Sequence, residues 1–280
     1  MLSKELQEKI LKLVKKEPCL VQDISQHIGK SWVATEGYVE RISKDTGLIR
    51  TKAFRKGTKG AVKVVYWNYS ESVQDDEVKE RLFQKIKLFA SKKEFDPLEI
   101  FQFAKDKRSN AIVEFKSKRL SSKHHKNFLS FLKKADSELL CFSGNISWIS
   151  IKEGKESALK IIEQFLKKRG VLKIICRIDI ASMKNIRLLE PLMKEFSGQI
   201  EIRHSSQPVR GFIMDSKIAR FKDEKKISDF KEGELSEDLY LFYELFDIDW
   251  VEWCKNVFWY LFRNSIGLQE RIKALDKLVF

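Results

Sequence analysis

Residues 21–68 read VQDISQHIGKSWVATEGYVERISKDTGLIRTKAFRKGTKGAVKVVYWN, and this stretch decides how the first part of the chain folds. A short amphipathic run ends at Gly29, and Ser31 stands where an N-cap would begin a second helix that Gly47 closes. Two runs of strand-forming residues follow, at 48–55 and 61–69, separated by KGTKG. Such a pair around a glycine-containing turn predicts a β-hairpin.

Another helix precedes this stretch. Residues 3–16 (SKELQEKILKLVKK) repeat apolar side chains at helical spacing, and Pro18 would end the helix. Three helices followed by a hairpin is the order of a winged helix-turn-helix, in which the third helix usually enters the DNA major groove. We therefore predict a DNA-binding domain over residues 1–70. The alternative is an adaptor whose winged helix binds another protein.

Basic residues are concentrated in the later part of the stretch. Between Arg41 and Lys63 there are eight Lys or Arg residues and one acid, Asp45. Such residues supply most non-specific DNA affinity because they release counterions from phosphates. The third helix would present Glu36 and Glu40 to the groove, where Glu can accept from cytosine N4. The predicted DNA-binding residues are Ser31, Trp32, Thr35, Glu36, Arg41, Lys44, Arg50, Lys52, Arg55, Lys56, Lys59 and Lys63.

The length and charge of the whole chain agree with this prediction. At 280 residues the chain is longer than most single domains, which favours two. Lys and Arg number 54 against 40 Asp and Glu, which gives a net charge of +14 and a pI near 9.4. This balance favours an anionic partner, either nucleic acid or an anionic membrane surface.

No segment indicates secretion, a membrane span or a metal site. The chain opens on an amphipathic helix, and no uncharged apolar run approaches the ~20 residues that span a bilayer. The cysteines Cys19, Cys141, Cys176 and Cys254 are far apart and lack a His partner at metal spacing. We expect a cytoplasmic protein with free thiols, no metal and no other cofactor.

Residues 71–119 form a predicted helical linker. One side of its helix is apolar and consists of Val78, Leu82, Phe83, Ile86 and Phe89. A second apolar helix, DWVEWCKNVFWYLFRNS at 249–265, is either buried or shared with a partner subunit. Both surfaces suit a homodimer that binds two half-sites of DNA. Segment 105–134 carries ten basic residues and two acids, and is either a second nucleic-acid surface or a solvated face.

From about residue 120 helices and buried strands alternate. Strands are predicted at ELLCFSGNISWI, VLKIICRID, QIEIRHS, RGFIMDS and KIARFKD. Near-continuous apolar strands that alternate with helices are typical of a sheet covered on both faces. The predicted fold class is therefore α+β: an N-terminal winged helix-turn-helix, a helical linker and a C-terminal α/β domain over 120–280.

The strand order of this last domain resembles one half of the phospholipase D superfamily. That family carries H-x-K-x-x-x-x-D, whose His is the nucleophile, and the corresponding segment here is QPVRGFIMDSKIARF. If Asp215 matches the motif Asp, Pro208 takes the place of the His and Arg210 that of the Lys. Proline has no side chain that can attack phosphorus. The resemblance therefore implies a phospholipase D-like domain without catalysis.

A winged helix-turn-helix joined by a helix to such a domain resembles the archaeal TrmB-type transcriptional regulators. The resemblance implies a non-enzymatic regulator of transcription that binds double-stranded DNA, with a second domain for a small-molecule effector or for dimerisation. The alternative is a phosphodiesterase or nuclease that acts through a non-standard site. Any ligand is expected at carboxyl ends of strands, near residues 143–145, Asp179 and residues 210–215.

Overall fold

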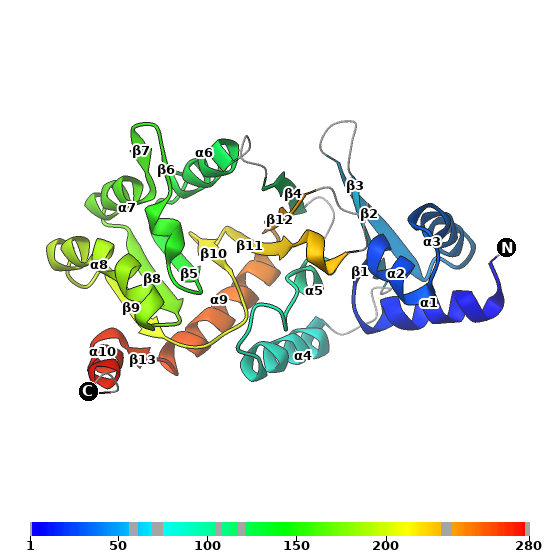
Figure 1. Cartoon of the computed structure of the whole chain (residues 1–280). Helices are drawn as coiled ribbons and strands as arrows, with labels where there is room; N and C mark the ends of the chain where they lie inside the picture. The colour runs from blue at the N-terminus through cyan, green and yellow to red at the C-terminus, as the bar shows by residue number, and fades with distance from the viewer. Residues whose placement is uncertain are drawn as a thin grey trace.

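The computed structural model describes residues 2–55, 61–68, 75–104, 108–116, 121–230 and 237–277. They form an N-terminal winged helix-turn-helix, a helical linker and a C-terminal α/β domain built on one large sheet (Figure 1). The predicted fold class is confirmed at this level.

The N-terminal unit has the predicted order of helices and strands. Its elements are α1 (Lys4–Lys16), β1 (Cys19–Leu20), α2 (Val21–Ile28), α3 (Trp32–Thr46), β2 (Ile49–Arg55) and β3 (Ala61–Trp67). Ser3 and Ser31 cap α1 and α3 by accepting a backbone N–H three residues on, at 3.2 and 3.3 Å. Gly29 and Gly47 end α2 and α3 with φ of 65° and 64°, a left-handed conformation that glycine adopts without strain.

The short strand β1 was not predicted. It pairs with β3, with Cys19 opposite Val65, and completes a three-stranded sheet in the order β1-β3-β2. Two residues are too few to show an alternating pattern, so the sequence carries no local signal for this strand. The helices pack on one face of the sheet around a common core: Ile10, Val14, Cys19, Val21, Ile24, Val39, Ile42, Ile49 and Val65.

The C-terminal domain contains an eight-stranded mixed sheet in the order β13-β9-β8-β5-β10-β11-β12-β4. The strands are β4 (Ser109–Phe115), β5 (Glu138–Phe142), β8 (Val171–Cys176), β9 (Ile200–His204), β10 (Gly211–Met214), β11 (Ile218–Lys225), β12 (Leu239–Leu245) and β13 (Ile266–Gly267). Strands β5, β8 and β9 are parallel, and β10 runs antiparallel to β5. A separate hairpin is formed by β6 (Lys152–Glu153) and β7 (Glu156–Ser157).

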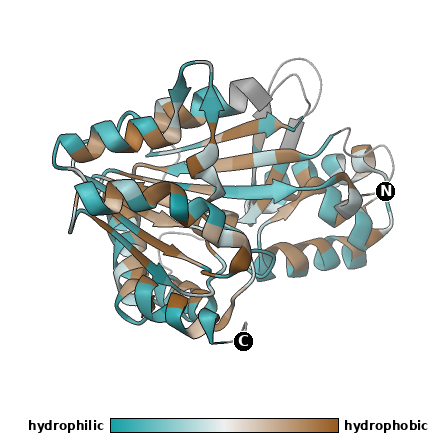
Figure 2. Ribbon diagram, turned by 60° about the vertical axis from the view of Figure 1, so that its left-hand side comes forward, coloured by the Kyte–Doolittle hydropathy of each residue, from teal (hydrophilic) through white to brown (hydrophobic). Residues whose placement is uncertain are grey.

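Helices cover both faces of this sheet, as predicted. They are α4 (Asp75–Leu88), α5 (Leu98–Phe101), α6 (Ser121–Leu132), α7 (Ala158–Lys167), α8 (Ile180–Glu195), α9 (Ile248–Arg263) and α10 (Leu268–Asp276). On β5, Leu140 and Phe142 join the core under α4, α5 and α9, whereas Leu139 and Cys141 join the core under α6, α7 and α8. Figure 2 shows that many strands of the sheet are largely apolar, whereas the surrounding helices have alternating hydrophilic and apolar bands.

Three strands of the sheet, β4, β12 and β13, were not predicted. Strand β4 lies inside the predicted linker and inside the basic segment 105–134, and it forms the edge of the sheet by pairing with β12. Strand β12 was not predicted because its sequence, LYLFYEL, follows a polar stretch and precedes a helix with no turn signal between them. This part of the linker therefore belongs to the sheet.

The two apolar helix faces expected to form a dimer contact each other within one chain. Val78, Leu82 and Ile86 of α4 and most apolar residues of α9 are buried in a single core. Phe83 meets Tyr260 edge-on, with ring centroids 4.9 Å apart. Most apolar side chains of the closing helix are therefore buried in its own domain.

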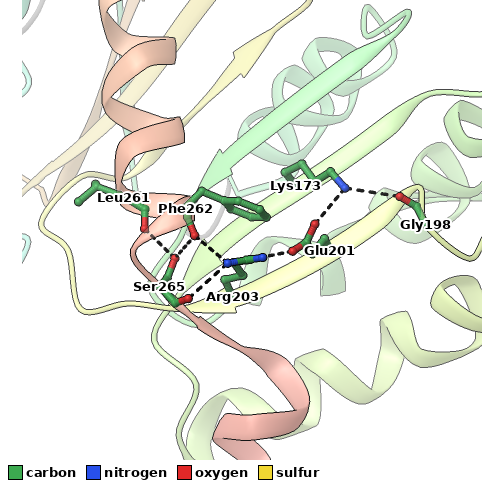
Figure 3. Close-up of polar contacts among 7 residues, drawn as sticks. All are labelled: Lys173, Gly198, Glu201, Arg203, Leu261, Phe262 and Ser265. Carbon is green, nitrogen blue, oxygen red and sulfur yellow. Dashed lines mark hydrogen bonds and ion pairs between the residues drawn. The ribbon is translucent and has the colours of Figure 1, made fainter.

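The end of α9 is tied to the sheet by Arg203 on β9 (Figure 3). Its guanidinium donates to the carbonyl oxygens of Phe262 and Ser265 at 3.3 and 3.5 Å, and it pairs with Glu201 at 2.7 Å. Carbonyl groups at a helix C-terminus lack partners within the helix, so a cation there is favourable. Lys173 on β8 also reaches Glu201, at 3.2 Å. This network fixes α9 across the parallel strands.

Candidate functional site

The exposed face of α3 is the part of the winged helix that the sequence predicts to enter a DNA groove. We call it the α3 face, and its members are Ser31, Val33, Gly37, Glu40, Arg41 and Lys44, all exposed. Val33 is 73% exposed, and a side chain added at Gly37 would meet no atom within 4 Å. The middle of the face is therefore smooth, and its charged groups lie towards the C-terminal end of the helix.

Two predicted contacts from α3 are not on this face. Thr35 is completely buried, and its hydroxyl donates to the carbonyl oxygen of Ser31 at 2.9 Å, so the prediction that it contacts DNA is wrong. Trp32 is half-buried and packs against the core of the N-terminal unit. The buried residues of α3 are Thr35, Val39 and Ile42.

Lys63 does not project from the wing as predicted. Its ammonium lies 3.0 Å from Glu36 and 2.6 Å from Glu40, and its side chain is 11% exposed. Burial lowers the pKa of Lys63, but hydrogen bonds to Glu40 and Glu36 outweigh this effect and raise it. The three side chains form a link between the hairpin and α3. Lys63 and Glu36 are therefore occupied with each other instead of being presented to DNA.

Other predicted basic residues differ in their surroundings. Arg41 and Arg50 are exposed, and Arg41 pairs with Asp45 at 3.4 Å, a surface contact of little energy. Lys52 is instead half-buried: its ammonium lies 4.8 Å from the centroid of the Phe101 ring and donates to the Ser109 hydroxyl at 3.5 Å. The side chain of Arg55, together with Lys56 and Lys59, lies outside the described residues. Lys30, exposed at the start of α3, was not predicted because it lies before the cap.

The positions matched to the phospholipase D motif lie at two ends of one strand. Pro208 and Arg210 precede β10, and Asp215 follows it. At ~3.3 Å per residue, the backbone of Arg210 is roughly 16 Å from that of Asp215. Arg210 donates to the carbonyl oxygens of Gln207 and Val209 at 2.8 and 2.6 Å. Arg210 and Asp215 therefore do not share a site.

Asp215 has a structural role at its end of the strand. Its carboxylate accepts the backbone N–H groups of Asp136, Ser137 and Glu138 at 3.0, 2.8 and 2.9 Å. Burial raises the pKa of Asp215, but these N–H donors outweigh it and hold the pKa below the ordinary value. Asp215 also has a φ of 52°, a left-handed conformation that Asp adopts more readily than most residues. It joins the start of β5 to the β10–β11 turn.

A cavity of about 570 Å³ lies at the other end of β10. Its wall includes residues 143–145 after β5, Arg210, and Arg220 and Lys222 on β11, with the linker residues 92–93 and 95–97 on another side. Residues 143–145 follow the carboxyl end of β5, where a ligand was expected, and Arg210 lies beside them because it precedes the antiparallel strand β10. Asp179 does not line the cavity, because it caps α8 by accepting the N–H of Ser182 at 2.9 Å.

Two basic residues of β11, Arg220 and Lys222, line the cavity but were not among the predicted site residues. Arg220 and Lys222 alternate with Phe221 and so point to one face of the strand. Burial lowers the pKa of Lys222 to about 8 and also lowers the pKa of Arg220. The signal was present in the alternation of KIARFKDEK, but the segment was assigned only as a strand.

The cysteines and the membrane prediction can be compared with the structure. All four cysteines are buried and free, and burial raises the pKa of Cys176 to about 12. Within the ranges that the structure describes, no group of three or more His, Cys, Asp or Glu side chains could hold a metal ion. Among those same residues, no helix has the length and apolar character that crossing a bilayer requires.

Comparisons with known proteins give low similarity. No protein-family model matches the chain, and no curated protein matches it. The chain is similar to TrmBL2, described as an archaeal chromatin protein, with 13% identity over 95% of both chains and a TM-score of 0.38. It is similar to NucT from Helicobacter pylori, with 11% identity over 57% of this chain and 99% of that one and a TM-score of 0.39. It is also similar to Nuc, a phospholipase D family member from Salmonella typhimurium, with 11% identity over 57% of this chain and 97% of that one and a TM-score of 0.38.

Proposed function

We propose that the protein is a DNA-binding regulator of transcription whose winged helix binds double-stranded DNA. The observation that carries the proposal is the open α3 face, with Lys30 at its start and Arg41 and Lys44 near its end. Arg50, the second residue of β2, is also exposed. Exposed cations around a groove-sized helix supply phosphate contacts, and the smooth centre formed by Val33 and Gly37 lets the helix approach the bases.

The test compares charge reversal on this surface with the same reversal elsewhere. The variant Arg41→Glu/Lys44→Glu/Arg50→Glu removes three exposed cations. A control variant, Lys160→Glu/Lys184→Glu/Lys194→Glu, changes three exposed lysines on α7 and α8. Both variants change the net charge by the same amount, so a general electrostatic effect would weaken both equally.

Binding to a duplex of about three helical turns is measured by fluorescence anisotropy between 50 and 200 mM salt. Each lost phosphate contact reduces the slope of log K against log salt by about 0.9, so the slope of the first variant should fall by roughly 2 to 3. The control should keep the wild-type slope. Equal slopes in the two variants would contradict the proposal, and so would wild-type binding that does not depend on salt.

Within this proposal the C-terminal domain is not an enzyme and the regulator is a cytoplasmic homodimer. Pro208 offers no nucleophile, and Asp215 is occupied by backbone N–H groups at the far end of β10. Incubation with labelled DNA, RNA and a chromogenic phosphodiester, with and without divalent metals, tests the alternative of a phosphodiesterase. Turnover that disappears in Arg210→Gln would overturn the proposal. Light scattering in solution tests the homodimer.

A further inference from the structure

Lys222 lies in the wall of the large cavity, on the face of β11 that also carries Arg220 and Glu224. The other two charged side chains of this face have partners of opposite charge. Arg220 lies 3.6 Å from Glu244, and Glu224 is bound by Lys92 at 2.5 Å. In the part of the chain that the structure describes, no carboxylate lies within ion-pair distance of the Lys222 nitrogen.

The side-chain nitrogen of Lys222 packs against aromatic rings. The β11–β12 register places Lys222 opposite Phe242 and next to Tyr240 on the same face. The nitrogen lies 3.5 Å from the centroid of the Tyr240 ring and 6.0 Å from that of Phe242. A ring face attracts an ammonium, and it also accepts an N–H from a neutral amine. The contact therefore suits both protonation states of the lysine.

The surroundings of Lys222 favour the neutral amine. Burial lowers the pKa of Lys222 to about 8, and Lys116 and Lys92 contribute to the lowering, whereas Glu224 and Glu114 oppose it. An ordinary lysine has a pKa of about 10.4, so near neutral pH the unprotonated fraction of Lys222 is larger by a factor on the order of a hundred. Only this form has the lone pair that attacks a carbon atom.

The cavity has room for an organic molecule beside this amine. Its volume of about 570 Å³ lies within the range of roughly 300–1,000 Å³ that is typical of small-molecule sites. Part of its wall is aromatic, where the Phe212 ring centroid lies 5.3 Å from that of Trp148 and 5.6 Å from that of Phe128. The wall also carries the carboxylates of Asp23 and Asp96 as well as basic side chains. Charges of both signs do not select an anion, whereas a flat neutral molecule fits the aromatic part.

We propose that Lys222 is a covalent attachment site that captures a small aromatic aldehyde in this cavity as a reversible imine. The nitrogen attacks the carbonyl carbon, a C–N double bond replaces the C–O double bond, and the oxygen leaves as water with the two protons of the amine. The step needs neither oxidant nor reductant, and hydrolysis returns the amine and the aldehyde. The inference goes beyond DNA binding and does not depend on it, because Lys222 and the aromatic wall lie in the C-terminal domain.

The test is imine trapping on the full chain without DNA. The protein is equilibrated with benzaldehyde at about pH 7.5, reduced with borohydride, digested and mapped by mass spectrometry. The reference is Lys217, which is exposed in the turn between β10 and β11. We expect at least about tenfold more adduct on Lys222 than on Lys217. Propanal, which is an aldehyde without a ring, should give a ratio at least about threefold lower.

Two variants and a pH series separate capture by Lys222 from a general effect of the aldehyde. Lys222→Arg keeps a cation beside the Tyr240 ring but forms no imine, and Lys217→Arg is the matched control. Benzaldehyde should raise the melting temperature of the wild type and of Lys217→Arg, because it binds the folded state, and should not raise that of Lys222→Arg. The Lys222 adduct of the wild type should reach half of its maximum near pH 8, about two units below an ordinary lysine.

Absence of an adduct on Lys222 overturns the proposal, as does an adduct no greater than that on Lys217. Equal ratios for benzaldehyde and propanal would show a reactive amine without a binding site for the ring, and would also overturn it. The same holds if benzaldehyde stabilises Lys222→Arg as much as the wild type. The adduct map and the pH series use the wild type alone, so they decide the question even if Lys222→Arg fails to fold. Failure of the DNA experiment above leaves this result unaffected.

Discussion

The link between Lys63, Glu36 and Glu40 leads to a prediction that separates stability from DNA binding. Charge counting along the sequence would assign Lys63 to the DNA surface, whereas the structure places it between two carboxylates. The double variant Lys63→Met/Glu40→Gln tests this difference. Methionine retains the apolar stem of lysine, and the simultaneous loss of one cation and one anion leaves the local net charge unchanged.

The expected loss of stability follows from the exposure of each partner. The contact of Lys63 with Glu40 is 2.6 Å long, but Glu40 is 60% exposed, so it contributes at most about 1 kcal/mol. Glu36 is 29% exposed, and its hydrogen bond to a largely covered ammonium contributes about 1 kcal/mol. The free energy of unfolding should therefore fall by about 1–2 kcal/mol. The slope of DNA affinity against salt should not change.

Arg50→Met provides the opposite pattern. Arg50 is exposed, so its loss should change the free energy of unfolding by less than about 0.5 kcal/mol while it lowers the salt slope by about 0.9. Urea unfolding followed by circular dichroism gives the first quantity, and anisotropy at several salt concentrations gives the second. If the Lys63 variant lost slope to the same extent as Arg50→Met and kept its stability, our account of the link would be refuted.

Three further changes test the fold itself. Phe258→Ala should lower the free energy of unfolding in urea by about 3–5 kcal/mol, because Phe258 is fully buried and the centroid of its ring lies 5.1 and 5.5 Å from those of Phe142 and Phe262. An unchanged unfolding midpoint would contradict this packing. Ser31→Ala should lower the free energy of unfolding by about 1 kcal/mol because the cap of α3 is lost, and Ser31→Thr should lower it less. Asp215→Ala should lower the free energy of unfolding by about 2 kcal/mol near neutral pH, because three backbone N–H groups lose their acceptor. The folded-state pKa of Asp215 lies below its ordinary value of 3.8. The loss of stability in Asp215→Ala should therefore persist above pH 3.8 and vanish as the pH falls through the folded-state pKa. A loss of stability that grows in acid would exclude the role given to Asp215.

The sequence predicted those features of the N-terminal unit that depend on local chemistry. Ser31, Gly29 and Gly47 act within a few residues of their own positions, so the bounds of α2 and α3 could be deduced from them. The orientation of α3 could not be deduced in the same way. Thr35 is polar and still buried, because its hydroxyl bonds to the backbone one turn earlier. This local bond makes a residue that resembles a surface residue suitable for the core.

Features that depend on contacts between residues far apart in the sequence could not be predicted from it. Lys63 meets Glu36 and Glu40 only because the register of the hairpin places it beneath α3. Strand β4 belongs to the large sheet only through its partner β12, more than a hundred residues later. Arg220 and Lys222 likewise share a cavity with residues 143–145 only because of the order of the strands in the sheet, which no spacing rule gives.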